Sequence, residues 1–170
     1  KNNVGFLTIG DENFGSYKEE TAELVKEIGA LGFKWSAGGT RVHTVDLDML
    51  KLWKANGCTS VSFGIESGSL TMLKVMEKKV TLEQNIKALK FAYEAGLATV
   101  VQLVIGMPGE TDVTIEETID FLKEVMKYYP DSYKNQLTFL ISINYAQALP
   151  GTPLYEYARN KNLIGRDFDG

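Results

Sequence analysis

The chain has 170 residues, of which 44% are hydrophobic and 24% charged, and its formal net charge at pH 7 is −4. This composition predicts one ordinary globular domain over residues 1–170, with enough apolar residues for a core. No membrane span is indicated, because the longest apolar stretch, residues 97–108, falls short of the ~20 residues that a spanning helix requires. The Lys and Arg residues are scattered, so this piece gives no sign of a nucleic-acid partner.

Cys58 is the single cysteine of the sequence, which rules out a disulfide within the chain. A lone thiol is compatible with a reducing, cytoplasmic setting. The chain opens on Lys1 without a targeting pattern and stops abruptly at Gly170. We therefore expect a cytoplasmic fragment cut from a longer protein.

The N-terminal part of the chain predicts two strands with a helix between them. Residues 4–9 predict the first strand, and the capping-box sequence at residues 16–19 opens a helix that Gly32 ends. A second, weaker strand is predicted over residues 33–37, followed by a loop over residues 38–41. The inward face of the helix is predicted to carry Leu24, Ile28 and Leu31.

The next part predicts a helix, a strand and a short helix. Asp46 is the expected N-cap of a helix that Gly57 closes. The strand that follows ends at Glu66, and a short helix is expected over residues 70–76. The inward residues of the first of these helices are predicted to be Leu47, Leu50 and Trp53.

Two further helices flank the fourth strand. The capping-box sequence at residues 81–84 opens a helix that Gly96 closes, and the fourth strand ends at Ile105. Another helix is expected from Thr114 to Pro130. The inward residues are predicted to be Leu82, Ile86, Leu89 and Tyr93 in the first helix and Ile115, Ile119, Leu122 and Met126 in the second.

A last strand is predicted over residues 137–144, and Thr152 with Pro153 starts a closing helix that runs to Arg159. A glycine stands between each of three helices and the strand after it, an order that demands right-handed crossovers and a parallel sheet. About five strand and helix units result, which can form an open doubly wound sheet or part of a barrel. Polar clusters after every strand favour the incomplete TIM-like (β/α) barrel.

These polar clusters predict a binding rim, since ligands are held at the carboxyl ends of parallel strands. The rim is acidic and hydroxylic, which suits a ligand with an amino group and hydroxyls rather than a phosphate-dominated one. The sequence has no Walker loop and no Gly-x-Gly-x-x-Gly turn. The clusters lie at residues 11–13, 38–43, 66–68, 106–111 and 144–151.

Several rim residues have a plain structural interpretation beside the functional one. Glu66 contacts a ligand, is a solvated loop acid or caps the next helix, and Glu110 serves a site or stabilises a helix N-terminus. Arg41 binds a carboxylate or pairs with Asp46 on the surface. Asp11 and Glu12 share a proton, bind a cation or form an ordinary acidic turn.

Gly106 and Gly109 allow either close approach of a ligand or the turn around Pro108. His43 has no metal ligands nearby in the sequence and reads as a polar loop residue. Cys58, at the start of its strand, reads as a small buried hydrophobe.

Short motifs run in order through nearly the whole chain. They are Gly57-Cys58, Gly64-Ile65-Glu66-Ser67-Gly68, Met76-Glu77-Lys78 with Thr81, Ala95-Gly96, Gly106-Met107-Pro108-Gly109-Glu110-Thr111 and Pro150-Gly151-Thr152. Together they resemble the radical S-adenosylmethionine (radical SAM) enzymes. Within that superfamily the chain is similar to the cobalamin-dependent type related to the anaerobic magnesium-protoporphyrin monomethyl ester oxidative cyclase, and next to the methylthiotransferases.

The resemblance implies about five units of a six-unit radical SAM barrel, with the first strand and its cluster loop upstream of Lys1. That loop carries the cysteines, in a Cys-x-x-x-Cys-x-x-Cys arrangement, that bind a 4Fe-4S cluster. Cys58 alone cannot ligate a cluster, so the fragment is expected to be inactive by itself. The resemblance also implies a small-molecule substrate, an electron donor protein and, in parents that have it, an upstream cobalamin domain.

Residue by residue, the resemblance implies that S-adenosylmethionine lies along the rim. Glu66 and Ser67 would contact its ribose, and Asp11 or Glu12 its amino group. Arg41 is the candidate for the methionine carboxylate. The backbone of Ile105, Gly106 and Met107 would line the adenine site.

The predicted function is radical oxidation, cyclisation or methyl or methylthio transfer by the parent enzyme, started by reductive cleavage of S-adenosylmethionine. One alternative is a barrel lyase or aldolase that uses Glu66 or Glu110 as general base, although no lysine partner at a strand end is evident in the sequence. The other is a noncatalytic scaffold whose rim binds nothing.

Overall fold

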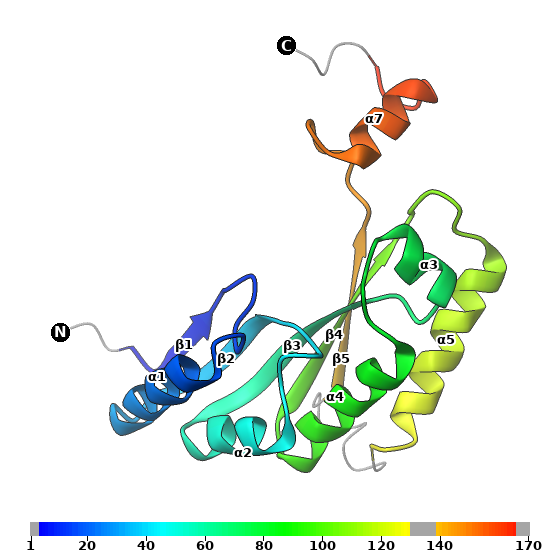
Figure 1. The fold of residues 1–170 in the computed structure, drawn as a ribbon. Helices are drawn as coiled ribbons and strands as arrows, with labels where there is room; N and C mark the ends of the chain where they lie inside the picture. Colours follow the sequence, from blue (N-terminus) through cyan, green and yellow to red (C-terminus); the bar gives the residue numbers. More distant parts are fainter. Residues whose placement is uncertain (1–3, 130–138, 166–170) are drawn as a thin grey trace.

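The computed structural model describes residues 4–129 and 139–165. Five parallel strands lie side by side in chain order in one curled sheet, with helices between consecutive strands on its outer face (Figure 1). The strands are β1 (Phe6–Ile9), β2 (Lys34–Thr40), β3 (Cys58–Glu66), β4 (Ala98–Ile105) and β5 (Phe139–Tyr145). The expected partial barrel is confirmed.

The helices follow the expected alternation, and the short helix expected after β3 is present. They are α1 (Lys18–Ala30), α2 (Leu47–Ala55), α3 (Leu70–Val75), α4 (Leu82–Glu94), α5 (Asp112–Met126) and α7 (Pro153–Asn160). Asp46, Thr81 and Thr152 are the N-caps that the sequence predicts, and each side chain accepts a hydrogen bond from a backbone N–H of the first turn. The capping box at Thr81 and Gln84 is complete.

The core lies between the sheet and its outer helices. Along β3, the buried residues Val61, Phe63 and Ile65 alternate with partly exposed ones, because successive side chains of a strand point to opposite faces. An aromatic cluster fixes α2 against β2, with Trp35 and Trp53 fully buried and their ring centroids 5.9 Å apart. Phe14 packs against both rings.

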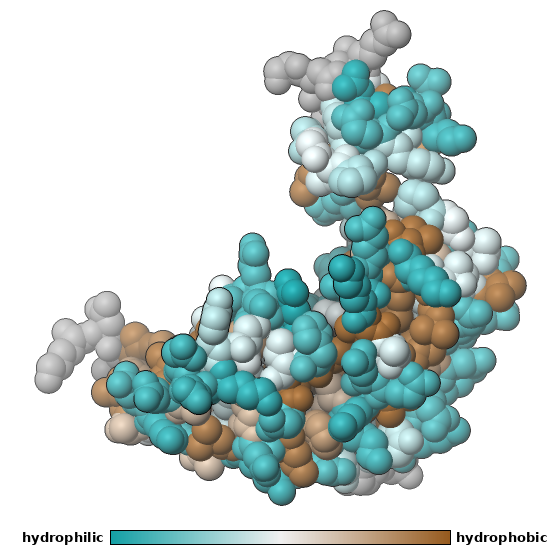
Figure 2. Space-filling view, in the orientation of Figure 1, coloured by the Kyte–Doolittle hydropathy of each residue, from teal (hydrophilic) through white to brown (hydrophobic). Residues whose placement is uncertain are grey.

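The opposite, concave face of the sheet is open. The molecule is hollowed between the β1 end and the α7 end (Figure 2). Because β3 and β4 pair in register, Ser62 lies beside Val100 and Gly64 beside Gln102 on this face. In a complete barrel such positions are normally filled by bulky branched side chains. Here several are small or polar.

The structure corrects two local predictions near the N-terminus. Residues 38–40, expected in a loop, belong to the end of β2. The N-cap of α1 is Tyr17, which makes no side-chain capping bond, so the capping box predicted at residues 16–19 does not form. Ser16 lies one position too early to reach the orphan amide groups of the first turn.

The inward faces of two helices were also predicted incorrectly. In α1, Leu24 and Leu31 are exposed, and Val25 with Ile28 faces the core. In α5, which begins at Asp112 rather than Thr114, the exposed residues are Ile115 and Ile119, and the buried ones are Thr114, Phe121 and Val125. Contact with the sheet sets the rotation of each helix, and hydrophobicity alone did not identify the contacting stripe.

The last strand is one residue longer than predicted at its C-terminal end, and residues 137 and 138 lie outside the described part.

α7 stands beyond the carboxyl ends of the strands (Figure 1). Within residues 4–129 and 139–165, none of the helices combines the length and the apolar character needed to cross a bilayer.

Candidate functional site at the mouth of the half-barrel

The carboxyl ends of the strands form one edge of the sheet, and a cavity of about 620 Å³ opens there between β4, β5, α3 and α7. Val104 and Asn144, which pair in register, contribute from the concave face. Met107, one of the residues predicted to line a cofactor, also lines this cavity. Its volume lies in the range of ordinary small-molecule sites, roughly 300–1,000 Å³.

Glu66 is the most tightly specified group at this edge. Its backbone has φ of 65°, a left-handed conformation that is rare for a residue other than glycine. The carboxylate turns back over the strand, so that a Cβ added to Gly64 would lie 2.8 Å from Glu66 Oε1. Lys78 Nζ donates to the same oxygen at 2.8 Å, and the Glu66 side chain is only 17% exposed.

Lys78 appears in the sequence analysis only as part of a motif, and its contact with Glu66 was not predicted. It follows α3 and reaches back across the end of β3. Its backbone N–H donates to Leu73 O, which folds the chain after α3 into position. The structure thus supplies a lysine at a strand end, but one already paired with the carboxylate beside it.

Ser67 faces away from the mouth. It is 2% exposed, and its Oγ lies 3.0 Å from Thr118 Oγ1 on α5. The same oxygen accepts from Ser69 N, while Gly68 N donates to the Thr118 hydroxyl. Ser67 therefore ties the loop after Glu66 to α5, and its hydroxyl is not presented to a ligand at the strand ends.

The turn after β4 is closed by its own acid. Gly106 N donates to Glu110 Oε2 at 2.6 Å, and Glu110 N donates to Met107 O. Gly106 and Gly109 both have positive φ, which the turn requires. Glu110 is thus engaged in the turn, and with Glu66 paired to Lys78 neither acid is a free general base.

Asp11 and Glu12 lie exposed after β1, and Asp11 Oδ1 accepts from Asn13 N at 2.8 Å. Their backbone crosses the end of β2 so closely that a Cβ on Gly39 would collide with the Asp11 carbonyl. Gly39, at φ of 64°, therefore allows the loop after β1 to lie against the next strand. This contact brings the acids to the same edge as the ends of β2 and β3.

Arg41 follows β2 directly, is exposed, and has no ion pair within the described residues. The alternative partner, Asp46, binds Lys18 instead, with Nζ 2.6 Å from Oδ2. The hydrogen bond from Lys18, together with that from Met49 N, lowers the pKa of the Asp46 carboxyl. Arg41 is thus left available at the mouth.

Cys58 begins β3, at the end of the strand remote from the mouth, and is buried. Burial raises the pKa of its thiol to about 12, so it is protonated at neutral pH. No group of three or more His, Cys, Asp or Glu side chains suited to a metal occurs in the part that the structure describes. With Cys58 as its single cysteine, the chain does not fit an iron–sulfur cluster, which needs several thiolate ligands.

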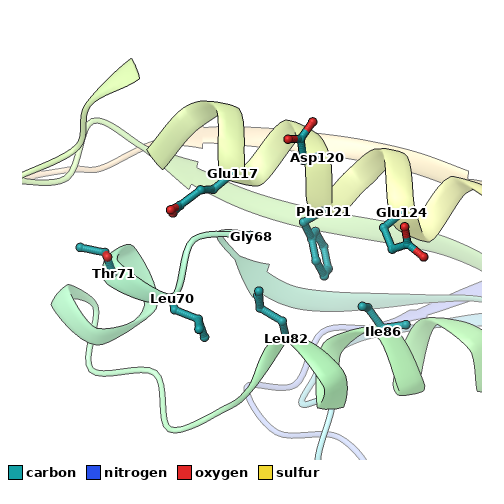
Figure 3. Close-up of a pocket in the computed structure, with 9 residues that line it drawn as sticks. All are labelled: Gly68, Leu70, Thr71, Leu82, Ile86, Glu117, Asp120, Phe121 and Glu124. Atoms are coloured by element: carbon teal, nitrogen blue, oxygen red, sulfur yellow. The ribbon is translucent and has the colours of Figure 1, made fainter. Parts of the chain in front are cut away.

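A second cavity, of about 420 Å³, lies on the helical side between α3, α4 and α5. Phe121 points into it between the apolar side chains of Leu82 and Ile86, while Glu117 and Asp120 lie along α5 (Figure 3). Asp120 is paired with Lys123 on its own helix. This groove is separate from the cavity at the ends of β4 and β5.

Residues 2–122 match the family model described as the radical SAM superfamily. The match covers more than half of the chain, in agreement with the partial barrel and with the motifs at its strand ends. The chain belongs to the radical SAM superfamily.

Two relatives illustrate where the similarity lies. An uncharacterized methyltransferase from Pyrococcus horikoshii is 35% identical over 157 residues, which are 91% of this chain and 31% of the relative. The anaerobic magnesium-protoporphyrin IX monomethyl ester cyclase of Rubrivivax gelatinosus is 30% identical over 128 residues, 73% of this chain and 23% of that protein. The chain thus spans about a third or less of these relatives.

Solved structures show the same fold. The radical S-adenosylmethionine methyltransferase TsrM from Kitasatospora setae, with cobalamin and a [4Fe-4S] cluster bound, has a TM-score of 0.72 at 20% identity, over 91% of this chain and 30% of that one. Coproporphyrinogen III oxidase from Escherichia coli has a TM-score of 0.65 at 20% identity, over 96% of this chain and 36% of that one.

Proposed function

We propose that residues 1–170 are the S-adenosylmethionine-binding part of a longer radical SAM enzyme. The observation that carries the proposal is the Glu66 carboxylate, held at the mouth of the half-barrel by Lys78 and by the space over Gly64. The bound cluster would supply the electron that breaks the C5′–S bond of S-adenosylmethionine, releasing methionine and a 5′-deoxyadenosyl radical that removes a hydrogen atom from a substrate.

Glu66 is proposed to accept hydrogen bonds from the ribose hydroxyls. Lys78 occupies Oε1, so Oε2 remains for the ligand, and the small exposure of the side chain keeps its orientation fixed. Ser67 is assigned an indirect part, because its bond to Thr118 places the loop that follows Glu66. This arrangement prepares the carboxylate before the ligand arrives.

The remaining predicted residues are assigned to the other parts of the ligand. Ile105, Gly106 and Met107 are proposed to lie along the adenine, since Met107 lines the cavity beside β4. Arg41 is proposed for the methionine carboxylate, and Asp11 or Glu12 for the amino group. Both assignments pair opposite charges: the ligand's carboxylate with the Arg41 guanidinium, and the ligand's ammonium with an acidic side chain.

The rest of the longer protein is proposed to provide what this chain lacks. That includes the cysteines of the cluster, a cobalamin domain in the cobalamin-dependent case, and contacts to a one-electron donor protein. We propose a small-molecule substrate, no nucleic-acid contact through this piece, and a reducing, cytoplasmic setting. A relative of known structure binds tryptophan together with an S-adenosylmethionine analogue.

The test is formation of 5′-deoxyadenosine by the full-length protein, reconstituted with its cluster and reduced with dithionite. Glu66→Gln should lower the rate by roughly tenfold or more, because a neutral amide is a weaker acceptor and the ion pair with Lys78 is lost. Glu116→Gln, on the exposed side of α5, is the matched control and should leave the rate unchanged. Wild-type protein that forms no 5′-deoxyadenosine would refute the proposal.

A further inference from the structure

The cavity of about 420 Å³ between α3, α4 and α5 is an apolar recess on the outer, helical side of the sheet. Leu82 and Ile86 of α4 and Phe121 of α5 converge on it (Figure 3). Figure 2 shows hydrophobic side chains gathered at the surface between these helices. We call this recess the outer groove. It lies apart from the cavity at the ends of β4 and β5, to which the proposed function assigns the cofactor.

Leu70 gives the outer groove an apolar wall that the core of this chain does not use. α3 packs inward through Met72 and Leu73, which are both fully buried. Leu70, at the start of the same helix, is 50% exposed and lines the groove. Gly68 lets this wall lie close to α5, because a Cβ there would come within 2.5 Å of Phe121 Cβ. A half-exposed leucine beside an apolar floor is stabilised most when a partner covers both.

The charged side chains that line the outer groove are all acidic. Glu117, Asp120 and Glu124 stand three and four residues apart on α5, so they share one side of that helix. Asp120 pairs with Lys123 and Glu124 with Lys127, but these are surface pairs, which contribute little and exchange partners readily. Glu117 extends toward α3 and has no ion pair in the described part of the chain (Figure 3). The edge of the groove therefore attracts cations.

The shape of the groove fits a helix. A neighbouring cavity, between α4 and the end of α5, shares Ile86 with the outer groove, so that the two continue one another along the α4–α5 seam. From Leu82 to Glu94, α4 lines this seam for about 18 Å, which is the length of about three helical turns. The neighbouring cavity is lined by two lysines and two glutamates and has no net charge. The cationic groups of an occupant therefore belong beside α5 at the outer groove.

We infer that the outer groove is a docking site for a separate protein, which inserts an amphipathic helix whose apolar stripe is flanked by Lys or Arg. Apolar side chains at i, i+3, i+4 and i+7 would cover Leu70, Ile86 and Phe121. The flanking cations would reach Glu117 and its neighbours on α5. Charge complementarity selects this occupant over a second copy, because the chain itself has a net charge of −4.

The test is the binding of a synthetic peptide to the full-length protein, measured by fluorescence anisotropy. The labelled peptide has about 12 residues, with leucines at the spacing given above, lysines along one flank and alanines elsewhere. Glu117→Lys should weaken binding by roughly fivefold or more, because it replaces an attraction by a repulsion. Glu116→Lys is the matched control. It changes the net charge equally but does not line the groove, so the affinity should stay within about twofold of the wild type.

The apolar wall is tested separately. Leu70→Ser should weaken peptide binding by roughly fivefold or more, because the leucine side chain is no longer there to be covered. Leu24→Ser, on α1 and 44% exposed, removes a comparable surface leucine away from the groove and should leave the affinity within about twofold of the wild type. The same peptide with glutamates in place of its lysines should bind roughly tenfold more weakly to the wild type.

Three results would overturn the inference. The first is equal peptide affinity of Glu117→Lys and Glu116→Lys together with equal affinity of Leu70→Ser and Leu24→Ser. The second is the absence of peptide binding to the full-length wild type, as expected if another part of the same protein covers the groove. The third is dimerisation in analytical ultracentrifugation that Leu70→Ser abolishes, which would assign the groove to a second copy. None of these results depends on cleavage of S-adenosylmethionine, so the proposed function is tested independently.

Discussion

The ends of β3 and β5 lie at the same edge of the sheet, yet they are held very differently. At the end of β3, Glu66 is paired with Lys78, and Ser67 is buried against Thr118. At β5, Ile143 is 58% and Tyr145 75% exposed, although both belong to a regular strand. β3 has a strand on each side, whereas β5 has β4 on one side only.

This difference shows which part of the proposed site the chain specifies by itself. The geometry of Glu66 depends on contacts from β3, the turn after α3 and α5, all of which are present. The exposed side of β5 has no such contacts among the described residues. The β3 end is therefore the part of the proposed site whose geometry the described residues fix.

The largest expected difference between the two regions is in core stability. Phe63→Ala, at a fully buried position of β3, should lower the free energy of unfolding by about 3–5 kcal/mol, through lost burial and a cavity. Ile143→Ala, on the exposed strand, should change it by less than about 1 kcal/mol. Urea unfolding of the 170-residue chain measures both. Equal losses would mean that β5 is as well packed as β3.

A substitution in the loop after Glu66 should have the second largest effect on stability. A Cβ on Gly68 would lie 2.8 Å from Thr118 Cα and 2.5 Å from Phe121 Cβ, so Gly68→Ala should cost about 1–3 kcal/mol by pushing α5 away. Gly10→Ala is the matched control, because nothing lies within 4 Å of the added Cβ and the glycine has no positive φ. Coinciding unfolding curves for Gly68→Ala and Gly10→Ala would contradict the close packing of Gly68 against α5.

The buried hydroxyl pair tests the same contact by polarity. Ser67→Ala should destabilise the chain by about 1–3 kcal/mol, because the Thr118 hydroxyl and Ser69 N lose a buried partner. In a double-mutant cycle with Thr118→Val, the two losses should be clearly less than additive. Additive losses would show that the hydroxyls do not depend on each other.

The smallest effect concerns the exposed ion pair at the start of α2. The pKa of Asp46 is lowered in the folded chain, so its stabilisation is present above the unfolded pKa and is lost as the pH falls through the folded one. Asp46→Asn keeps an N-cap side chain and should cost less than about 1 kcal/mol at pH 7, since both partners are about half exposed. The stabilities of wild type and variant should converge as the pH falls below the folded pKa of Asp46. A difference in stability between the two proteins that persists at low pH would exclude the Asp46 charge as its cause.

Sequence patterns predicted the parts of the fold that depend on local chemistry. Asp46, Thr81 and Thr152 cap helices because the capping bond forms within a few residues of the same segment. Glu66 at the end of β3 follows from the position of an acid after an apolar run. The alternation of strands and glycine-ended helices predicted the parallel sheet, and the polar clusters after the strands favoured the partial barrel over an open doubly wound sheet.

The features that sequence missed depend on contacts between distant segments. Lys78 lies 12 residues from Glu66, and only the path of the chain around α3 brings the two together. Gly39 is needed because the Asp11 backbone passes over it. The buried position of Ser67 is set by its contact with Thr118 of α5, which lies 51 residues later in the sequence. No local period encodes such approaches.

The most direct test of the account is the affinity of the cluster-loaded full-length protein for S-adenosylmethionine, measured by equilibrium binding with and without Glu66→Gln. We predict roughly tenfold weaker binding for the variant, because the Glu66 carboxylate is proposed to hold the ribose. The control Glu116→Gln should bind as the wild type does. Equal affinity of Glu66→Gln and the wild type would contradict the assignment of the β3 end as the cofactor site.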